Sequence, residues 1–335
     1  MLYYIGRFAP PYGGVTIKNE LLYKKILSKI SIKKINTGQL KISKIKNIVY
    51  FLIVLLKRNN RFVLGVSATW RKLLSAFLYY FNRDSMNKTL LIVMGGEFAD
   101  IIYKDRSYKK WISNYKQIYV ETLSMKYKLE KLDINNVSVY PNCREKPKDE
   151  ILINKREGKL RCVFFSMIYP EKGVDIILEA AAGLSKIEFD FWGDINTNYK
   201  EEFLQTISKL SNCRYRGVFK SNEDNVYQLL NSYDVLLFPT RCKGEGVPGV
   251  LIEAKLSGLP AIVSNLAYNA EIVKNATEGI VLKENSNLCL KETIELLDKD
   301  RDLLNSLKIG SHKSAGKYYI ENYIDIIKKD LEEQE

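Results

Sequence analysis

Two glutamates in the segment GEGVPGVLIEAKLSGLP, residues 244–260, have a spacing that suggests ligand chemistry. Glu245 and Glu253 are separated by seven residues, and a Gly-Val-Pro-Gly turn lies between them. The apolar run after the turn has helical character, and Gly258 followed by Pro260 is a common helix stop. Free N–H groups at the start of such a helix, together with the helix dipole, favour an anion.

The residues around this helix start could contact two kinds of ligand group, namely a negatively charged phosphate and hydroxyl groups. Pro248 fits the first helical position, with Gly246 and Gly249 around it. Because a carboxylate repels phosphate, Glu245 is better placed to accept hydrogen bonds from hydroxyls. Glu253, about a turn and a half into the helix, could hold the two vicinal hydroxyls of a ribose. The segment suits a sugar nucleotide, although an acidic first helical turn and a loop beside a buried helix remain simpler interpretations.

Two further segments contain residue types that bind anions. Gly13 and Gly14 in PPYGGV, residues 10–15, lie between a strand-like run and a helix, where backbone N–H groups can approach an anion closely. Lys172 in PEKG, residues 170–173, follows the first strand of the second half and could stabilise a diphosphate leaving group. A tight turn and a surface lysine are the ordinary alternatives.

Strand-like and helix-like segments alternate along the chain, which predicts an α/β fold with parallel sheets. The predicted strands include residues 61–67, 89–96, 160–166, 187–193, 234–240 and 259–265, and the predicted helices include 16–30, 173–184, 199–210 and 248–258. The polar stretch 144–159 is the best candidate for a linker. We therefore expect domains at 1–150 and 151–315, a C-terminal helix at 316–335 that packs towards the first domain, and a ligand cleft between the two domains.

The charge of the chain is concentrated in its first half. Residues 1–150 contain 28 Lys and Arg against 11 Asp and Glu, a net charge of +17, whereas the remainder carries −4. Such a half favours an anionic partner, namely a membrane surface, a nucleic acid or an anionic substrate. A compositional bias towards Lys, Ile, Asn and Tyr is the alternative, but it explains the asymmetry poorly.

Several classes of protein are disfavoured by the remaining residues. The five cysteines form no C-x-x-C pair, and with the single histidine His312 they disfavour a zinc site and fit reduced thiols in the cytosol. Asp298-Lys299-Asp300 resembles a metal motif but lies in a charged helical stretch, so no metal is expected. His312 near the tail makes a nucleophilic relay improbable. The N-terminus does not resemble a signal peptide, and the apolar run 48–56 is too short to cross a bilayer.

Taken together, these motifs resemble the donor-site signature of family 4 glycosyltransferases, which are retaining enzymes with the GT-B fold. The resemblance rests on FPTRCKGEGVPGVLIEAKLSGLPAIVSN (238–265), PPYGGV, GGEF (95–98), VYPN (139–142), PEKGVDIILEA (170–180) and NSYDVLLFPT (231–240). It covers most of the chain and is strongest for bacterial enzymes that build capsule, O-antigen or exopolysaccharide. It implies two Rossmann-like domains that face each other across a cleft.

The resemblance also implies a role for each site residue. Glu253 would bind the ribose hydroxyls, and Glu245 the sugar that is transferred. The backbone of Gly246, Val247, Pro248 and Gly249 would line the sugar and diphosphate pocket. Lys172 would bind the diphosphate, with Gly13 and Gly14 approaching it from the other domain. Neither a metal nor another cofactor is implied, because the nucleotide diphosphate sugar, UDP- or GDP-linked, is a co-substrate.

Two departures from the family pattern concern the diphosphate and the acceptor. Ser166 and Met167 stand where many relatives have Gly-Arg, so Lys172 acts alone or Arg241 or Lys243 substitutes. The histidine that relatives often have in the first domain is also absent. Glu97 is a candidate acceptor contact, and a structural role for it is equally open.

The basic first half then suggests a lipid-linked saccharide acceptor and an anionic inner membrane surface. Segments 41–58 and 70–83 mix Lys and Arg with apolar residues, as an interfacial helix does, although ordinary packing on the sheet is an equal alternative. We expect a cytoplasmic protein, peripheral on the inner face of the cell membrane, that binds no nucleic acid because no known module appears.

A different class of function also has to be considered. The missing arginine and histidine would fit a catalytically silent sugar-nucleotide-binding subunit that supports a partner transferase. An NAD-dependent oxidoreductase is disfavoured because the G-x-G-x-x-G fingerprint is absent.

Overall fold

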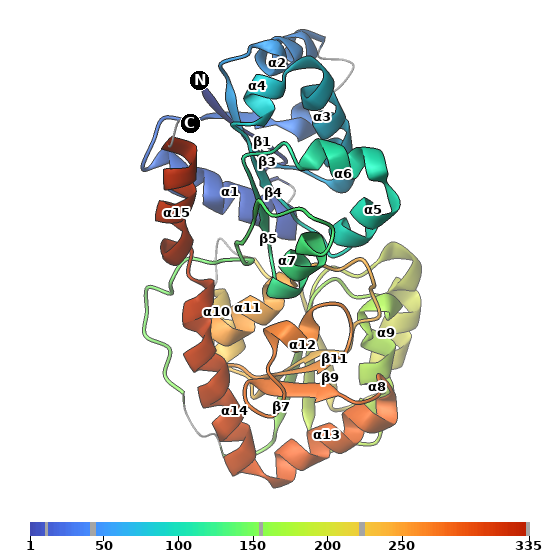
Figure 1. The fold of residues 1–335 in the computed structure, drawn as a ribbon. Coiled ribbons are helices and arrows are strands. Elements are labelled where there is room, and N and C mark those ends of the chain that lie inside the picture. The colour runs from blue at the N-terminus through green and yellow to red at the C-terminus, as the bar shows by residue number, and fades with distance from the viewer. Residues whose placement is uncertain (11–12, 41–44, 154–156, 221–224, 333–335) are drawn as a thin grey trace. The chain divides into compact units, whose positions relative to one another are not determined.

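The computed structural model describes residues 1–335 apart from 11–12, 41–44, 154–156, 221–224 and 333–335. Contacts within the chain divide it into two compact units (Figure 1). Unit 1 consists of Met1–Glu145, Gly244–Val247 and Tyr318–Glu335, and unit 2 of Lys146–Lys243 and Pro248–Lys317. The segment 244–247, which includes the first glutamate of the sequence motif, is therefore assigned to unit 1.

Unit 1 contains a six-stranded sheet in the order β2-β1-β3-β4-β5-β6, and every pairing is parallel. The strands are β1 (Leu2–Gly6), β2 (Lys33–Asn36), β3 (Arg61–Gly65), β4 (Leu90–Ile92), β5 (Gln117–Val120) and β6 (Val137–Val139). The chain runs from β1 to β2 on one side and then crosses to β3 on the other. The topological switch point, where parallel sheets bind ligands, lies between the carboxyl ends of β1 and β3.

Helices cover this sheet, and the C-terminal helix is one of them. They are α1 (Gly14–Leu27), α2 (Ile45–Leu56), α3 (Ala68–Phe81), α4 (Arg83–Met86), α5 (Phe98–Lys104), α6 (Arg106–Ile112), α7 (Leu123–Glu130) and α15 (Glu321–Glu332). In Figure 1, α15 lies beside α1, and Ile324 and Ile327 share a buried apolar cluster with Leu2 and Tyr4 of β1. The end of the chain thus completes the core of unit 1.

Unit 2 repeats the architecture with a parallel sheet in the order β12-β11-β10-β7-β8-β9. Its strands are β7 (Arg161–Phe165), β8 (Glu188–Trp192), β9 (Cys213–Gly217), β10 (Val235–Phe238), β11 (Ala261–Ser264) and β12 (Gly279–Leu282). The four residues of β10 and of β11 are all buried, as expected for central strands with both faces covered. The switch point of this sheet lies between β7 and β10.

The helices of unit 2 include the one that contains Glu253. They are α8 (Val174–Ala182), α9 (Lys200–Ser208), α10 (Val226–Asn231), α11 (Gly249–Leu256), α12 (Asn269–Ile272), α13 (Asn287–Lys299) and α14 (Arg301–Ser314), with short 3-10 turns η3 (Pro170–Lys172) and η4 (Thr197–Tyr199). The last turn, η5 (Ala315–Tyr318), leads from unit 2 to unit 1.

The predicted fold class of two doubly wound α/β units is confirmed, while some element boundaries differ from prediction. Segment 70–83 is not one helix, because α3 ends at Phe81 and the side chain of Asn82 accepts a hydrogen bond from Ser85 N–H to begin α4. Segment 41–58 contains α2, and residues 41–44 lie outside the described residues. None of the helices in the described parts of the chain is long and apolar enough to cross a membrane.

Candidate functional site

The switch point of the unit 2 sheet brings two of the predicted site segments into contact. Arg241 N–H, after β10, donates a 2.7 Å hydrogen bond to the carbonyl oxygen of Glu171, after β7, and the Thr240 hydroxyl donates to the same oxygen at 3.3 Å. Parallel sheets bind ligands outside the carboxyl ends of the strands at such a point. The turn that contains Lys172 and the loop that leads to the glutamate motif therefore form one edge of a candidate anion site.

A glycine makes this close approach possible. Gly173 has the left-handed φ of +79°, and a Cβ atom there would collide with the carbonyl group of Pro239 at the end of β10. Only glycine adopts this backbone conformation without strain and leaves the necessary space. The spacing Pro-Glu-Lys-Gly thus fixes where Lys172 lies against β10.

Lys172 lies at the carboxyl end of the sheet, as the sequence predicts. It is the last residue of η3, and its Nζ is 5.5 Å from the ring centroid of Phe238, the final residue of β10. The residue as a whole is partly exposed. The position suits a cation that meets a diphosphate.

Helix α11 starts one residue later than the sequence suggests. Pro248 is the N-cap residue, with φ −62° and ψ 125°, and Gly249 is the first helical residue. The N-cap has extended backbone, which the fixed φ of proline permits. The N–H groups of the first turn of α11, which have no partner within the helix, therefore still lie in the predicted segment 244–260. Glu253 lies in the second turn and is partly exposed, whereas its neighbours Ile252 and Ala254 are buried.

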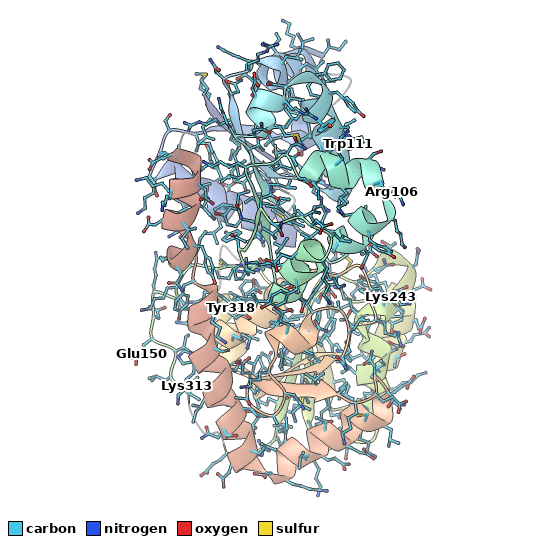
Figure 2. The ribbon with its side chains drawn as sticks, viewed as in Figure 1. Arg106, Trp111, Glu150, Lys243, Lys313 and Tyr318 are labelled. Carbon is cyan, nitrogen blue, oxygen red and sulfur yellow. The ribbon has the colours of Figure 1, made fainter. Side chains whose placement is uncertain are left out.

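Of the two cations considered as substitutes for the missing arginine, Arg241 already has a carboxylate partner. Its Nη2 donates to both carboxylate oxygens of Asp175 at 2.8 Å, and this bond joins the loop after β10 to the start of α8. Lys243, labelled in Figure 2, is exposed. Met167 is about half exposed and has no charge to offer a diphosphate. Lys172 and Lys243 thus stay the candidate cations for a diphosphate contact.

The segment 244–247 packs against the carboxyl edge of the unit 1 sheet. A Cβ atom on Gly246 would lie 2.7 Å from Glu121 Oε2 and 3.1 Å from Gly95 Cα, so a larger residue at position 246 would displace the Glu121 carboxylate. A Cβ atom on Gly244 would lie 3.6 Å from the carboxyl carbon of Glu97, an ordinary contact. The structure therefore brings the exposed Glu97, at the N-cap position of α5, close to the segment that contains Glu245.

Three residues that the sequence did not single out as functional hold this segment. Val247 N–H donates to Glu121 Oε2 at 3.3 Å, and Asn142 Nδ2 donates to the Val247 carbonyl oxygen at 2.8 Å. Lys18 Nζ donates to the other oxygen of Glu121 at 2.8 Å, and the two side chains are 2% and 5% exposed. Charged residues are rarely so deeply buried. The sequence signal for Glu121 is its position directly after the strand QIYV, because ligand sites of parallel sheets lie at the carboxyl ends of the strands.

Gly13 and Gly14 lie at the start of α1, which begins at Gly14, two residues before the predicted helix 16–30. Gly13 is the N-cap residue, and its N–H donates to the Thr16 hydroxyl oxygen at 2.9 Å. Added Cβ atoms on either glycine would meet no atom of the described chain within 4 Å beyond their chain neighbours. A ligand could therefore approach this backbone. Pro11 and Tyr12 of the same motif lie outside the described residues.

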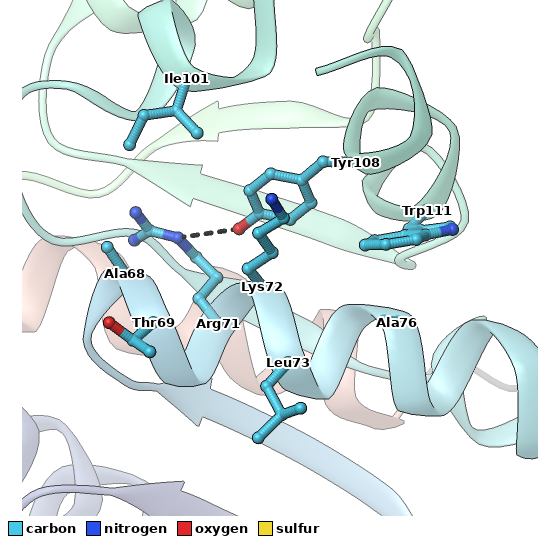
Figure 3. A pocket seen from close by; sticks show the side chains of 9 residues that line it. All are labelled: Ala68, Thr69, Arg71, Lys72, Leu73, Ala76, Ile101, Tyr108 and Trp111. Carbon is cyan, nitrogen blue, oxygen red and sulfur yellow. Dashed lines mark hydrogen bonds between the residues drawn. The ribbon is translucent and has the colours of Figure 1, made fainter. Parts of the chain in front are cut away.

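Unit 1 also contains a groove with an apolar wall and two cations. The groove has a volume of about 540 Å³ and lies among α3, α5 and α6 (Figure 3). Buried Arg71 donates to the Tyr108 hydroxyl at 3.3 Å, and Lys72 pairs with Asp105 at 2.9 Å, which lowers the pKa of that carboxyl. Its lining consists of Ala68, Thr69, Arg71, Lys72, Leu73, Ala76, Ile101, Tyr108 and Trp111.

The fold and the candidate site define the class of the protein. It consists of two doubly wound α/β units, and the second sheet has a candidate anion site at its switch point. Residues 145–313, half of the chain, match the family described as glycosyl transferases group 1. The chain belongs to this family. Residues 298–300, considered earlier as a metal motif, have other roles: Asp298 pairs with Arg301, and Asp300 caps α14.

Two curated bacterial proteins are similar to part of the chain. An uncharacterized 41.2 kDa protein in the cps region of Klebsiella pneumoniae is 29% identical over 146 residues, which cover 43% of this chain and 37% of that protein. The Escherichia coli UDP-Gal:alpha-D-GlcNAc-diphosphoundecaprenol alpha-1,3-galactosyltransferase is 24% identical over 219 residues, 59% of this chain and 54% of that protein. The chain thus matches between about a third and a half of the length of these relatives.

The fold is similar to that of a solved structure over nearly its whole length. The crystal structure of Anabaena HepE in complex with UDP has a TM-score of 0.72 and 12% sequence identity, and the match covers 98% of this chain and 99% of that chain. At this identity the likeness concerns the fold, and it confirms the predicted GT-B class.

Proposed function

We propose that this group 1 glycosyltransferase is a retaining enzyme of the family 4 type that needs no metal ion. It would transfer a sugar from a nucleotide diphosphate sugar to a lipid-linked saccharide in surface polysaccharide biosynthesis. The observation that carries the proposal is the contact between the Lys172 turn and the loop after β10 at the switch point of unit 2.

The donor would bind mainly through charge and hydroxyl contacts. Lys172 would neutralise the diphosphate, whose negative charge grows as the bond to the sugar breaks. The backbone of Val247, Pro248 and Gly249 would line the pocket, and Glu253 would accept hydrogen bonds from the ribose hydroxyls. The leaving phosphate would take the acceptor's proton, so no protein base is needed.

The transferred sugar and the remaining diphosphate contacts are assigned to unit 1. Glu245, between two glycines, would contact hydroxyls of the sugar. Gly13 and Gly14 would approach the diphosphate through their backbone, since no side chain of the described residues lies within 4 Å of a Cβ atom added to either glycine. Two of the similar proteins are named with UDP or UDP-Gal, which favours a uridine nucleotide over a guanosine nucleotide.

The acceptor proposed is a saccharide on a lipid diphosphate. The name of the E. coli relative includes such a lipid, which supports this choice. The groove beside α3 combines an apolar wall with Arg71 and Lys72, and these are the groups that an anionic, partly apolar acceptor would meet (Figure 3). Glu97 would contact the acceptor sugar.

An exposed apolar face on α2 supports binding at a membrane surface. Ile45, Val49, Leu52, Ile53 and Leu56 recur at helical spacing on this helix, and all five are more than a third exposed. Surface helices of this kind, with cations nearby, bind anionic bilayers. Changing Ile53 and Leu56 to Ser should release the protein from anionic vesicles in a sedimentation assay. Equal sedimentation of the two forms would contradict this part of the proposal.

The experiment that tests the function is a transfer assay with purified protein. UDP- and GDP-sugars are supplied with a GlcNAc-diphospholipid acceptor in excess EDTA, and the product is analysed by mass and by the anomeric proton coupling in NMR. We expect transfer from one nucleotide sugar with retained anomeric configuration. An inverted product, or activity that EDTA abolishes, would contradict the proposed mechanism. Loss of transfer in Glu245→Ala would support an enzymatic role, whereas transfer that survives both this change and Lys172→Met would exclude it.

A further inference from the structure

We propose that Glu121 and Asn142 are positioning residues that hold the peptide backbone at Val247 and so orient Glu245 for sugar transfer. This inference rests on the proposed function, because it assigns these residues a part in the same reaction. Neither side chain needs to touch the substrate. Together with Lys18 they are called the Val247 clamp below.

The clamp engages both polar groups of one residue's backbone. The N–H of Val247 is bound by Glu121 Oε2 at 3.3 Å, and its carbonyl oxygen is bound by Asn142 Nδ2 at 2.8 Å. Val247 is itself 6% exposed. Two side chains from different strand ends thus fix the orientation of the backbone two residues after Glu245.

The side chains that hold Val247 are fixed in turn by buried partners. Glu121 shares its carboxylate, with Oε1 bound by Lys18 and Oε2 by the Val247 N–H. The Lys18 ammonium also lies 4.8 Å from the ring centroid of Tyr140. Asn142 Oδ1 accepts a 2.9 Å hydrogen bond from buried Arg144, which leaves the amide nitrogen to face Val247. A polar network in which each member has a partner is rigid.

The sequence around Glu245 explains why such a clamp is useful. Glu245 lies between Gly244 and Gly246, and glycine has the most backbone freedom of any residue. A larger residue at position 246 would displace the Glu121 carboxylate, because its Cβ atom would lie 2.7 Å from Glu121 Oε2. A carboxylate that must meet specific hydroxyls needs support from its surroundings. The clamp supplies the rigidity that two glycines remove.

A purely structural role for the buried ion pair is the competing explanation. Lys18 and Glu121 could simply stabilise unit 1, in which case their loss would lower the melting temperature without a specific effect on residues 244–247. The two explanations differ in whether amide exchange becomes faster at residues 244–247 and in whether kcat falls. A matched control must therefore break a similar buried hydrogen bond elsewhere in unit 1.

Two buried asparagines that each donate to a backbone carbonyl oxygen allow a comparison, and they differ in that only Asn142 Oδ1 accepts a hydrogen bond among the described residues. Asn142→Asp removes the donor to the Val247 carbonyl oxygen and keeps the oxygen that Arg144 binds. Asn60→Asp removes an equivalent bond, from buried Asn60 Nδ2 to the Val54 carbonyl oxygen at 2.8 Å, at the end of α2. A second clamp variant combines Lys18→Met with Glu121→Leu, so that no unpaired charge remains buried.

The first measurement is backbone amide hydrogen exchange in the full-length protein. Exchange at 244–247 should become at least about tenfold faster in both clamp variants and stay at the wild-type rate in Asn60→Asp, since local opening sets the exchange rate. Unchanged exchange in the clamp variants would overturn the proposal. The exchange rates do not depend on whether the wild-type protein transfers a sugar. A failure of the proposed function, which the transfer assay would show, is therefore distinguished from a failure of the clamp.

The second measurement is steady-state transfer together with UDP binding, well below each melting temperature. In both clamp variants kcat should fall at least about tenfold while the dissociation constant of UDP changes less than about threefold, because orientation and not nucleotide binding is lost. Asn60→Asp should keep the wild-type kcat even if its melting temperature falls equally. A kcat close to wild type in Asn142→Asp would contradict the assigned role.

Discussion

At the scale of single residues, the two glutamates of the motif belong to different units of the fold. Glu253 belongs to a helix of unit 2, and the segment with Glu245 is held on unit 1 by Glu121 and Asn142. The sequence predicted that Lys172 follows a strand and that Glu253 lies on a helix, because each belongs to a local motif, and it placed the start of that helix one residue too early. It could not predict the Glu121 contact, since Glu121 and Val247 are 126 residues apart.

A cysteine beside the Lys172 turn provides a chemical probe of the proposed donor site. Cys242 and Cys289 are both partly exposed. Cys242 Sγ lies 3.5 Å from the Glu171 carbonyl oxygen, and Cys289 lies on α13. Burial raises the pKa of Cys143 and of Cys213 to about 12, and keeps these thiols protonated and unreactive at neutral pH.

We therefore predict that iodoacetamide modifies Cys242 and Cys289 in the native protein and all five cysteines after unfolding. Saturating UDP should slow modification of Cys242 at least about fivefold and leave Cys289 unchanged, because a bound diphosphate covers the first thiol only. Peptide mass spectrometry measures both rates. Equal protection of both cysteines, or of neither, would argue against a donor site at the Lys172 turn.

At the scale of elements, local sequence patterns located the central parts of both sheets. The strands β7, β10 and β11 and the helix α11 were predicted because they are apolar runs bounded by turn residues. The edge strands β2 and β9, KKIN and CRYRG, were not singled out, since both are short and contain two cationic residues each. The order of the strands depends on contacts between distant residues, so no local pattern reveals it.

Helix α11 is anchored by a buried ion pair that the sequence did not reveal. Lys255 is 2% exposed, and its Nζ donates to Glu278 Oε2 at 2.6 Å and to the Ser314 hydroxyl at 2.8 Å. Burial lowers the pKa of Lys255, because the charged form is poorly solvated. The pair joins the helix that contains Glu253 to the residue before β12 and to the end of α14.

Removing one member of this pair should cost more than removing both. Lys255→Met leaves Glu278 partly buried without its cation, and we expect the free energy of unfolding to fall by about 3 kcal/mol. Lys255→Met with Glu278→Gln should recover at least about half of that loss. Urea denaturation of the three proteins measures the difference. A double variant as unstable as the single one would show that the lost packing, rather than the unpaired charge, is responsible.

At the scale of the whole molecule, the residues proposed to act are divided between the two units. Unit 2 supplies the cation and the helix start that suit a nucleotide diphosphate, and unit 1 supplies the segment with Glu245, the groove beside α3 and the exposed apolar face of α2. The charge asymmetry of the sequence fits this division, because the basic half is the one proposed to meet a membrane and a lipid-linked acceptor.

The central claim, that the Lys172 turn and α11 bind the nucleotide, is tested most directly by UDP affinity. Isothermal titration calorimetry compares the wild type with Lys172→Met, Glu253→Gln and the control Lys313→Met, an exposed residue of α14 that Figure 2 labels. We predict that Lys172→Met weakens UDP binding about 10- to 100-fold and Glu253→Gln about tenfold, from the loss of charge-assisted hydrogen bonds. The control should bind as the wild type does. Wild-type affinity in both Lys172→Met and Glu253→Gln would contradict the account.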